Sequence, residues 1–598
     1  MLRILLTDRV AAKIPADFHF ARLFTARKLS QAESLYLRRS GIKRFYLPTL
    51  SSEDVILFFA AFDRFWDTLI RDFGRDHVFW RNAVSSKMQE WESSAGYLAV
   101  VLFALTKAPD PRTSLWIITD SLEEEDLIKA WGKKQGWTIV EPFRQPRWLR
   151  RGIQEAKNFI RYLYLVYTVF RRKIFSAESK NSHSMPEKNS VLLASMFYPS
   201  SFKEGQYKDP FFGNLHEFLS NKGKHVAYLS DSIPLPDASI HMSVKECQNV
   251  ILKMPLILLN WVEWAGVLIR LFCRRIKFPP APFMDCDFSG FLDWQARSFK
   301  FHFNWHAEVY YEAVKKICRR HVFEELIFNF EGNVFERGCL QAVEGSSTWT
   351  CGYSQGVIYP ENLKLRLSSW EGRLRPEPQR IVCTGPQARE FFSRVGNREN
   401  RWLAPGCTLR EIPPFSANCR WDPKIILVAL DGVYNTVTVL DWLLEQQDFL
   451  KDYHVRLRGH PNVPLAEIQK QCLGEFPSNF VMSDRTLQED ILESGCVFYR
   501  HTSIGLQALV NGKPVVHLSI DCPLPGDPLE DITLGKWGVH SPQELKEVLN
   551  RIGRLTPDER ASLKDVRRWL EGYFTPPREE TMGDFLPEKR MEVCLNRS

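Results

Sequence analysis

The chain has 598 residues, which is too long for one hydrophobic core and predicts two to four domains. Hydrophobic residues make up 44% and charged residues 25%, as in an ordinary globular protein. Lysine and arginine exceed aspartate and glutamate by 79 − 71 = 8, a mild excess that does not indicate nucleic acid as a partner. The 13 cysteines form no CxxC pair and no cluster at zinc spacing, so the sequence predicts no metal site and favours the reducing cytoplasm.

The first 175 residues are predicted to form an α/β domain of unknown role. Its strand-like runs lie at residues 3–7, 43–47, 98–103, 115–119 and 137–140. We interpret the first run as a strand, since it is too short for a signal peptide. The polar segment 176–190 is typical of a flexible linker.

Strands and helices then alternate, as in parallel sheets with crossover helices. We predict two Rossmann-like domains, residues 191–375 and 376–560, that face each other across a cleft. A strand at residues 380–383 is expected to open the second of them. A hydrophobic helical insertion, residues 249–285, interrupts the first. Residues 561–598 are expected to form a tail that is charged and helical at first and then Pro-rich and loose.

Two hydrophobic segments raise the question of membrane contact. Residues 159–170 and 254–273 are rich in apolar side chains, but charged residues interrupt both and basic clusters follow both. Neither offers the roughly 20 uninterrupted apolar residues of a spanning helix. Two interpretations stay open: amphipathic helices lying on the cytoplasmic face of the inner membrane, or core helices whose basic ends suit the helix dipole.

A carboxylate follows the predicted strand at residues 326–330. Ligands of open α/β sheets bind beyond the carboxyl ends of the strands. Glu331 there is expected to be partly desolvated, with a raised pKa that suits a general base, and Gly332 lets a substrate approach. Glu336 is the rival candidate, and the alternative for Glu331 is a carboxylate that serves a helix dipole.

A histidine follows the predicted strand at residues 454–458. Pro461 restricts His460 to an extended backbone, and its ring can donate to a phosphate oxygen while Arg458 adds positive potential. The alternative is a loop histidine without a task.

Hydroxyl groups follow the predicted strand at residues 496–499. Thr502 and Ser503 lie where a helix begins, and free N–H groups there favour a phosphate, with Gly505 keeping the first turn slim. The alternative is that either hydroxyl is merely an N-cap. Asp431, after another predicted strand, could hold a ribose or an acceptor hydroxyl, but Asp-Gly is common in plain turns and we favour that interpretation.

The succession Glu331-Gly332, His460-Pro461 and Thr502-Ser503 resembles the motifs of bacterial sialyltransferases and polysialyltransferases. Residues 503–516 resemble the end of capsule Kdo-transferases and related surface-carbohydrate biosynthesis proteins. The turn Ser354-Gln355-Gly356 resembles their Gln-His-Gly turn. The resemblance covers about residues 190–545.

This resemblance implies a GT-B fold and an inverting mechanism without metal or cofactor. It implies Glu331 as the base, His460 as a contact of the donor phosphate, and Thr502 and Ser503 as contacts of the phosphate or nucleotide. Three positions depart from the pattern: the acidic pair is reduced to Phe330-Glu331, Gln355 replaces a histidine, and Gln507 replaces a glutamate that often holds the ribose.

The implied function is a glycosyltransferase of bacterial capsule, O-antigen or lipopolysaccharide biosynthesis. Its expected partners are a nucleotide sugar, with a CMP-activated acidic sugar first, and a glycan or lipid-linked acceptor. One alternative is transfer of glycerol- or ribitol-phosphate from a CDP donor, for which two histidines near the phosphate would be expected. Another is a degenerate GT-B module that binds glycan or scaffolds an assembly, which the departures at Gln355 and Gln507 favour.

Overall fold

The structure is a computed structural model. It describes residues 3–7, 22–25, 31–40, 43–74, 76, 79–81, 87, 94–107, 114–119, 121–140, 146–175, 178, 190–232, 238–299, 304–356, 358, 362–395, 398, 402–410, 421–431, 436–460, 465–524 and 526–587. Most of the predicted linker, residues 176–190, lies outside these ranges.

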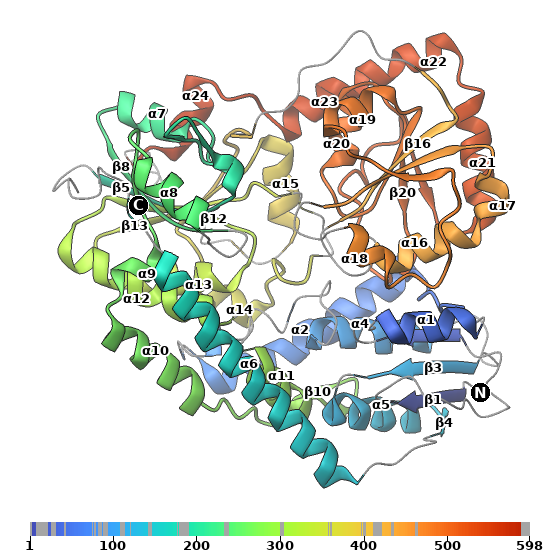
Figure 1. The fold of residues 1–598 in the computed structure, drawn as a ribbon, viewed down its shortest axis with the longest axis horizontal. Helices are drawn as coiled ribbons and strands as arrows, with labels where there is room; N and C mark the ends of the chain where they lie inside the picture. Colours follow the sequence, from blue (N-terminus) through green and yellow to red (C-terminus); the bar gives the residue numbers. More distant parts are fainter. Residues whose placement is uncertain are drawn as a thin grey trace.

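A seven-stranded parallel sheet forms the first lobe (Figure 1). Its strands are β5 (Ser190–Phe197), β8 (His225–Ser232), β9 (Ile251–Lys253), β12 (Glu325–Asn329), β13 (Trp349–Tyr353), β14 (Arg380–Val382) and β15 (Trp402–Ala404). They lie in the order β15-β14-β13-β12-β5-β8-β9, so the winding reverses between β5 and β12. The central strands are buried along almost their whole length, because helices cover both faces of such a sheet.

A six-stranded parallel sheet forms the second lobe. Its strands are β16 (Ile425–Ala429), β17 (His454–Arg458), β18 (Phe480–Met482), β19 (Cys496–Tyr499), β20 (Val515–Leu518) and β21 (Lys536–Val539). The order β18-β17-β16-β19-β20-β21 is that of a Rossmann sheet, with its switch point between β16 and β19. Two Rossmann-like lobes confirm the predicted α/β fold of GT-B type.

Two predicted boundaries of these lobes are wrong. The strand predicted at residues 380–383 does not open the second domain, because β14 pairs with β13 in the first sheet. The tail predicted after residue 560 is helical at first, as expected, but its later part is not loose as far as residue 587. Helix α23 (Val566–Tyr573) packs against both lobes, and Phe585 lies in the core of the first lobe beside α24 (Glu579–Met582) (Figure 1).

The N-terminal unit is α/β, as predicted. Its parallel sheet has the order β2-β3-β1-β4, with β1 (Arg3–Thr7), β2 (Arg22–Thr25), β3 (Ser114–Ile118) and β4 (Thr138–Val140). Helices α2 (Ser52–Phe73), α4 (Ala95–Thr106) and α5 (Leu122–Lys134) pack with it. The prediction of a strand at residues 98–103 is wrong, because that run lies inside α4, and residues 43–47 form no strand either.

The insertion of the first lobe contributes to the core of the N-terminal unit. It contains α9 (Pro255–Leu258), α10 (Trp261–Cys273) and a hairpin of β10 (Pro282–Phe283) and β11 (Cys286–Asp287), followed by α11 (Ser289–Phe299). The rings of Phe283 and Phe288 lie 5.8 and 5.5 Å from that of Phe65 in α2. The two units therefore share one aromatic core.

Helix α6 (Arg147–Phe175) connects the N-terminal unit to the first lobe and runs beside α10 (Figure 1). None of the helices in the described ranges combines the length and the apolar character needed to cross a membrane.

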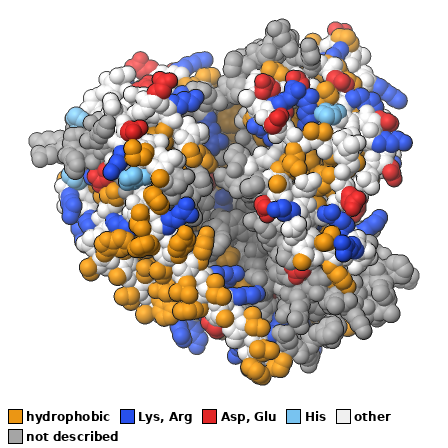
Figure 2. Space-filling model, viewed as in Figure 1, with side chains coloured by type: hydrophobic (Ala, Val, Ile, Leu, Met, Phe, Trp, Pro, Cys, Tyr) orange, Lys and Arg blue, Asp and Glu red, His pale blue; other side chains and the backbone are white. Residues whose placement is uncertain are grey.

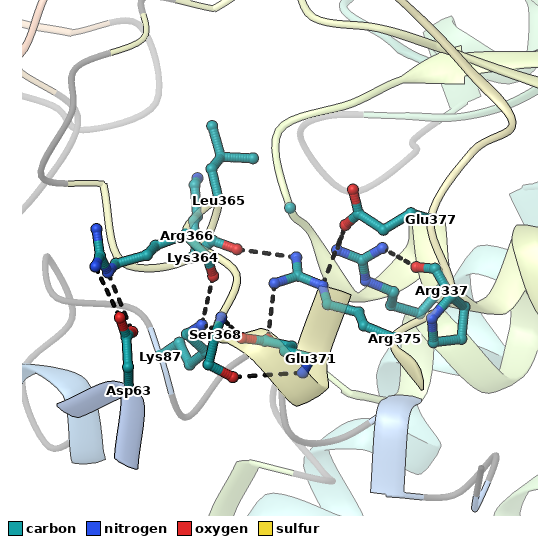
Figure 3. A network of polar contacts seen from close by, with 12 residues as sticks. Asp63, Lys87, Arg337, Lys364, Leu365, Arg366, Ser368, Glu371, Arg375 and Glu377 are labelled. Carbon is teal, nitrogen blue, oxygen red and sulfur yellow. Dashed lines mark hydrogen bonds and ion pairs between the residues drawn. The ribbon is translucent and has the colours of Figure 1, made fainter. Parts of the chain in front are cut away.

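A buried ionic network joins the N-terminal unit to the first lobe (Figure 3). Three cations donate to the carbonyl oxygens of residues 364–366 in turn: Arg375 to the first at 2.9 Å, Arg398 to the second and Lys87 to the third at 2.6 Å. Lys87 precedes α4, and its ammonium also lies 5.5 Å from the ring centre of Trp66 in α2. The loop of residues 364–366 is thus held from two sides.

Two buried carboxylates compensate these cations. Glu371 binds Lys87 at 2.6 Å and Arg375 at 3.0 Å, and Glu377 binds Arg398 at 3.0 Å. Burial is the largest influence on the pKa of Lys87 and lowers it to about 8. Removing one member of such a network leaves a buried charge unpaired, which costs more than the network's net contribution.

We expect Lys87→Met to lower the free energy of unfolding by about 3 kcal/mol, because Glu371 and the third carbonyl lose their cation. Thermal and urea denaturation would measure the loss. The matched control is Lys107→Met, which breaks an exposed pair with Asp54 and should cost about 0.5 kcal/mol. Equal stability of the two variants would contradict a structural role for the buried lysine.

Candidate active site

Glu331 lies directly beyond β12, at the switch point of the first sheet. Its side chain is half-buried, and Oε1 accepts a hydrogen bond from Gln355 Nε2 at 3.0 Å. The same oxygen lies against Gly356, where an added Cβ would stand 3.3 Å from it. Gln355, the residue that replaces the expected histidine, therefore orients the candidate base.

Glu336 has a structural role in the same turn. Its side chain is fully buried, and its two oxygens accept from the backbone N–H groups of Glu331 at 2.9 Å and Gly332 at 3.0 Å. Burial is the main cause that raises the pKa of Glu336 to about 7. Because an acceptor cannot reach it, Glu331 is the better placed of the two carboxylates.

Gly332 is required by its surroundings. Its φ is +81°, which disfavours a side chain, and an added Cβ would lie 3.2 Å from the carbonyl oxygen of Lys364. The glycine thus lets the loop of residues 364–366 approach, whereas the sequence suggested that it lets a substrate approach. The ionic network described above holds that loop in place.

The switch point of the second sheet brings together Asp431, His501 and Cys522. Asp431 follows β16 and His501 follows β19, the two strands that flank the switch point. Asp431 Oδ2 lies 3.7 Å from His501 Nδ1, and Cys522 Sγ lies 3.5 Å from His501 Nε2. Asp431 also accepts from Thr436 Oγ1 at 2.5 Å, so it is more than the plain turn residue that the sequence favoured.

The neighbours of His501 keep its ring protonated. Burial lowers the pKa of His501, but Cys522 and Asp431 outweigh burial and raise it to about 9. Burial raises the pKa of the Cys522 thiol, but the positive charges of Arg500 and His501 outweigh burial and lower that pKa to about 7. For Asp431, burial favours the neutral acid, but His501 and Arg500 hold the pKa below its ordinary value. The cluster therefore holds an imidazolium at neutral pH.

His460, beyond β17, lies on the same edge of the second sheet. It is half-buried, and burial is the main cause that lowers its pKa, with Asp431 acting in the opposite direction. Arg410, which follows β15 of the first lobe, also lowers the pKa of His460. His460 thus lies within electrostatic range of groups from both lobes.

The other predicted donor contacts differ in what they bind. The guanidinium of Arg458 is held by Asp490 at 2.8 Å, which makes it part of the scaffold. Thr502 Oγ1 accepts from the backbone of Ile504 at 3.4 Å, whereas Ser503 makes no capping hydrogen bond at the start of α20 (Ile504–Val510). This helix has only seven residues, so its dipole is short.

Gly505 and Gln507, both on α20, complete the set of predicted donor contacts. At Gly505 an added Cβ would lie 2.8 Å from the ring of Tyr499, so the helix backbone packs directly on this ring. Gln507 is half-buried on α20. Pro461 lies outside the described residues.

Within the described part of the chain, no three His, Cys, Asp or Glu side chains are grouped so that they would hold a metal ion. Among the described residues, the Glu331 side chain accepts hydrogen bonds from Gln355 and, at 3.5 Å, from Asn333 Nδ2, and both partners belong to the first lobe. The candidate groups thus form two sets: Glu331 with Gln355 at the edge of the first sheet, and Asp431, His501 and Cys522, with His460 nearby, at the edge of the second.

The sequence matches no family model and no curated protein. Similar solved structures include sucrose-phosphate synthase from Thermosynechococcus elongatus, at 14% identity over 68% of this chain and 100% of that one, with a TM-score of 0.40. MurG from Acinetobacter baumannii has 10% identity over 67% and 100% of the two chains, with a TM-score of 0.33. Anabaena Alr3699/HepE, in complex with UDP and glucose, has 11% identity over 68% and 99%, with a TM-score of 0.37. Likenesses this distant say nothing about activity.

We expect the His501 ring to titrate near pH 9, and Cys522→Ser to lower this pKa, because the thiolate that stabilises the imidazolium is removed. NMR titration of the histidine ring protons would measure both values. His460 is the internal control, since Cys522 is not among the groups that shift it. An unchanged pKa of His501 in Cys522→Ser would refute the pairing.

Proposed function

We propose that the protein is a nucleotide-sugar-dependent glycosyltransferase that inverts configuration and uses no metal ion. The observation that supports this best is that ionisable side chains lie at the switch points of both sheets. Glu331 stands at that of the first sheet, and Asp431 and His501 flank that of the second. A base on one lobe and cationic groups on the other match what glycosyl transfer to a hydroxyl needs.

In the proposed reaction, Glu331 accepts the proton of an acceptor hydroxyl as its oxygen bonds to the anomeric carbon of the donor. The bond from that carbon to the phosphate oxygen breaks, and its electron pair leaves with the nucleotide. The imidazolium of His501 and the ring of His460 stabilise the charge on the departing phosphate. These cationic and N–H groups take the role that a metal ion has in other transferases.

The finer assignment depends on the sequence resemblance described above. We propose a CMP-activated acidic sugar as donor, a glycan or lipid-linked acceptor, and a role in bacterial surface polysaccharide biosynthesis. The half-buried edge around His460, Thr502 and Ser503 is where the nucleotide phosphate would bind.

We expect Glu331→Gln to reduce nucleotide release from the donor about 10²- to 10⁴-fold, because the amide cannot accept the proton. Donor binding, followed as a rise in melting temperature with added nucleotide, should persist. Glu475→Gln is the matched control, since Glu475 is an exposed glutamate of the second lobe. A full rate in Glu331→Gln would exclude this residue as the base.

A second candidate function is transfer of an alditol phosphate from a CDP donor. The observation that favours it is the second histidine: His501 joins His460 around Asp431, and this chemistry was expected to need two histidines at the phosphate. Here the acceptor hydroxyl gives its proton to the neutral ring of His460 as its oxygen bonds to the phosphorus next to the alditol. The bridging P–O bond breaks, and CMP leaves while the phosphate stays in the product.

Labelled phosphorus would separate the two functions. We expect CMP and CDP to raise the melting temperature more than UDP or GDP, and we expect product from a CMP-sugar to form and to contain no phosphorus from the donor. Product that retains the label of β-³²P CDP-glycerol, with no turnover of CMP-sugars, would favour the second candidate instead. Nucleotide binding without any turnover would indicate a binding module.

A further inference from the structure

The outer faces of α6 and α10 are apolar and exposed. On α6 the exposed side chains include Phe159, Ile160, Leu163, Tyr164, Tyr167 and Phe170, at 50–63% exposure. On α10 they are Trp261, Val262, Ile269 and Phe272, with Val262 exposed to 80%. We call these ten residues the outer face. Figure 2 shows hydrophobic side chains gathered over the region where these two helices lie.

The two helices form one continuous surface. The rings of Phe170 and Trp261 lie 5.9 Å apart, and those of Tyr162 and Phe272 lie 5.0 Å apart. The helices are therefore antiparallel neighbours, since the end of α6 meets the start of α10. Their inner sides, through Leu165 among others, are already buried against the first lobe. Helices that are apolar on both sides need a second apolar environment.

Charge identifies what covers the outer face. Helix α6 contains eight lysine or arginine residues and one glutamate. Three of these cations pair with the carboxylates of neighbouring elements, and Lys173 donates to backbone carbonyl oxygens. The other four, Arg151, Lys157, Arg161 and Arg171, form no ion pair with any residue that the structure describes. Lys157, Tyr164 and Arg171 follow one another at intervals of seven residues, which places them in one row along the edge of the outer face. Beyond α10, Arg275 and Lys277 are exposed as well.

We propose that the outer face lies on an anionic lipid bilayer, with the two helices parallel to the surface. Apolar side chains enter the acyl boundary, tyrosine and tryptophan rings suit the headgroup level, and the lysine and arginine side chains reach the lipid phosphates. A second copy of the chain fits less well, because the cations beside the outer face of each copy, such as Lys157 and Arg171, would repel each other. This inference does not depend on the proposed reaction.

The test is flotation of the full chain with vesicles of phosphatidylcholine alone or with 30% phosphatidylglycerol, at low and high salt. We expect binding only to the anionic vesicles, and weaker binding at high salt because the charges are screened. Ile160→Ser with Leu163→Ser should reduce binding about tenfold or more by removing buried methylene groups. Lys157→Gln with Arg171→Gln should reduce it about tenfold as well.

Matched controls exist elsewhere on the surface. Ile56→Ser with Leu57→Ser removes two exposed aliphatic residues of α2, and Lys133→Gln with Lys451→Gln removes two exposed cations, so both should leave binding unchanged. Circular dichroism would confirm that each variant is folded. Absent binding, binding indifferent to lipid charge, or a dimer in sedimentation that Ile160→Ser with Leu163→Ser converts to monomer would each overturn the proposal.

Discussion

The candidate base depends on three buried cations that bind three successive carbonyl groups, those of residues 364–366. This loop packs on Gly332, where an added Cβ would lie 3.2 Å from the carbonyl oxygen of Lys364 and where φ is +81°. A fourth cation, Arg337, binds Glu377 at 3.3 Å and stands 5.6 Å from the ring of Phe330, the residue before Glu331. The backbone around Glu331 is therefore fixed on both sides by charged groups that are shielded from water.

The balance of charge in this network explains its rigidity. In the part of the chain that the structure describes, Lys87, Arg337, Arg375 and Arg398 form ion pairs with two carboxylates, those of Glu371 and Glu377, while Glu336 acts on Arg337 from further away. Backbone carbonyl oxygens of residues 364–366 and Pro376 supply further acceptors. Burial lowers the pKa of Lys87 to about 8 and that of Arg337 to about 10. Such groups tolerate little displacement, since an unpaired buried charge is costly. The N-terminal unit, which supplies Lys87, is thus part of the foundation of the first lobe.

Much of the fold could be predicted because fully buried parallel strands are short apolar runs that end in polar turns. The predicted bounds of β17 and β19 agree with the structure to the residue. The same rule failed at residues 98–103, because α4 is buried on every side and has no polar face to reveal its period. The prediction assigned β14 to the wrong sheet, because the residues of a strand do not show which neighbouring strand it pairs with.

The sequence predicted only those features of the candidate site that depend on residues close together in the chain. Glu331 and His460 were found because each follows a strand, but His501 gains its significance from Cys522, 21 residues further on. Asp431 looked like a plain turn because its partners lie on other segments. In the same way, only the folded chain shows that Glu336 caps the turn while Gln355 holds Glu331.

The two histidines of the second lobe have opposite shifts, and this difference bears on what each can do. The pKa of His501 is raised to about 9 by Cys522 and Asp431 against the effect of burial, so its charge is present before any ligand arrives. The pKa of His460 is lowered, mainly by burial, so its ring is neutral at pH 7 and has one donor and one acceptor nitrogen. A permanent charge costs no reorganisation when a phosphate leaves, whereas a neutral ring can accept a proton or donate a hydrogen bond. In the glycosyl transfer, where Glu331 takes the proton, His501 therefore suits the stabilisation of charge and His460 suits the donation of a hydrogen bond to the phosphate. In the alditol-phosphate transfer, the neutral ring of His460 can take the proton of the acceptor.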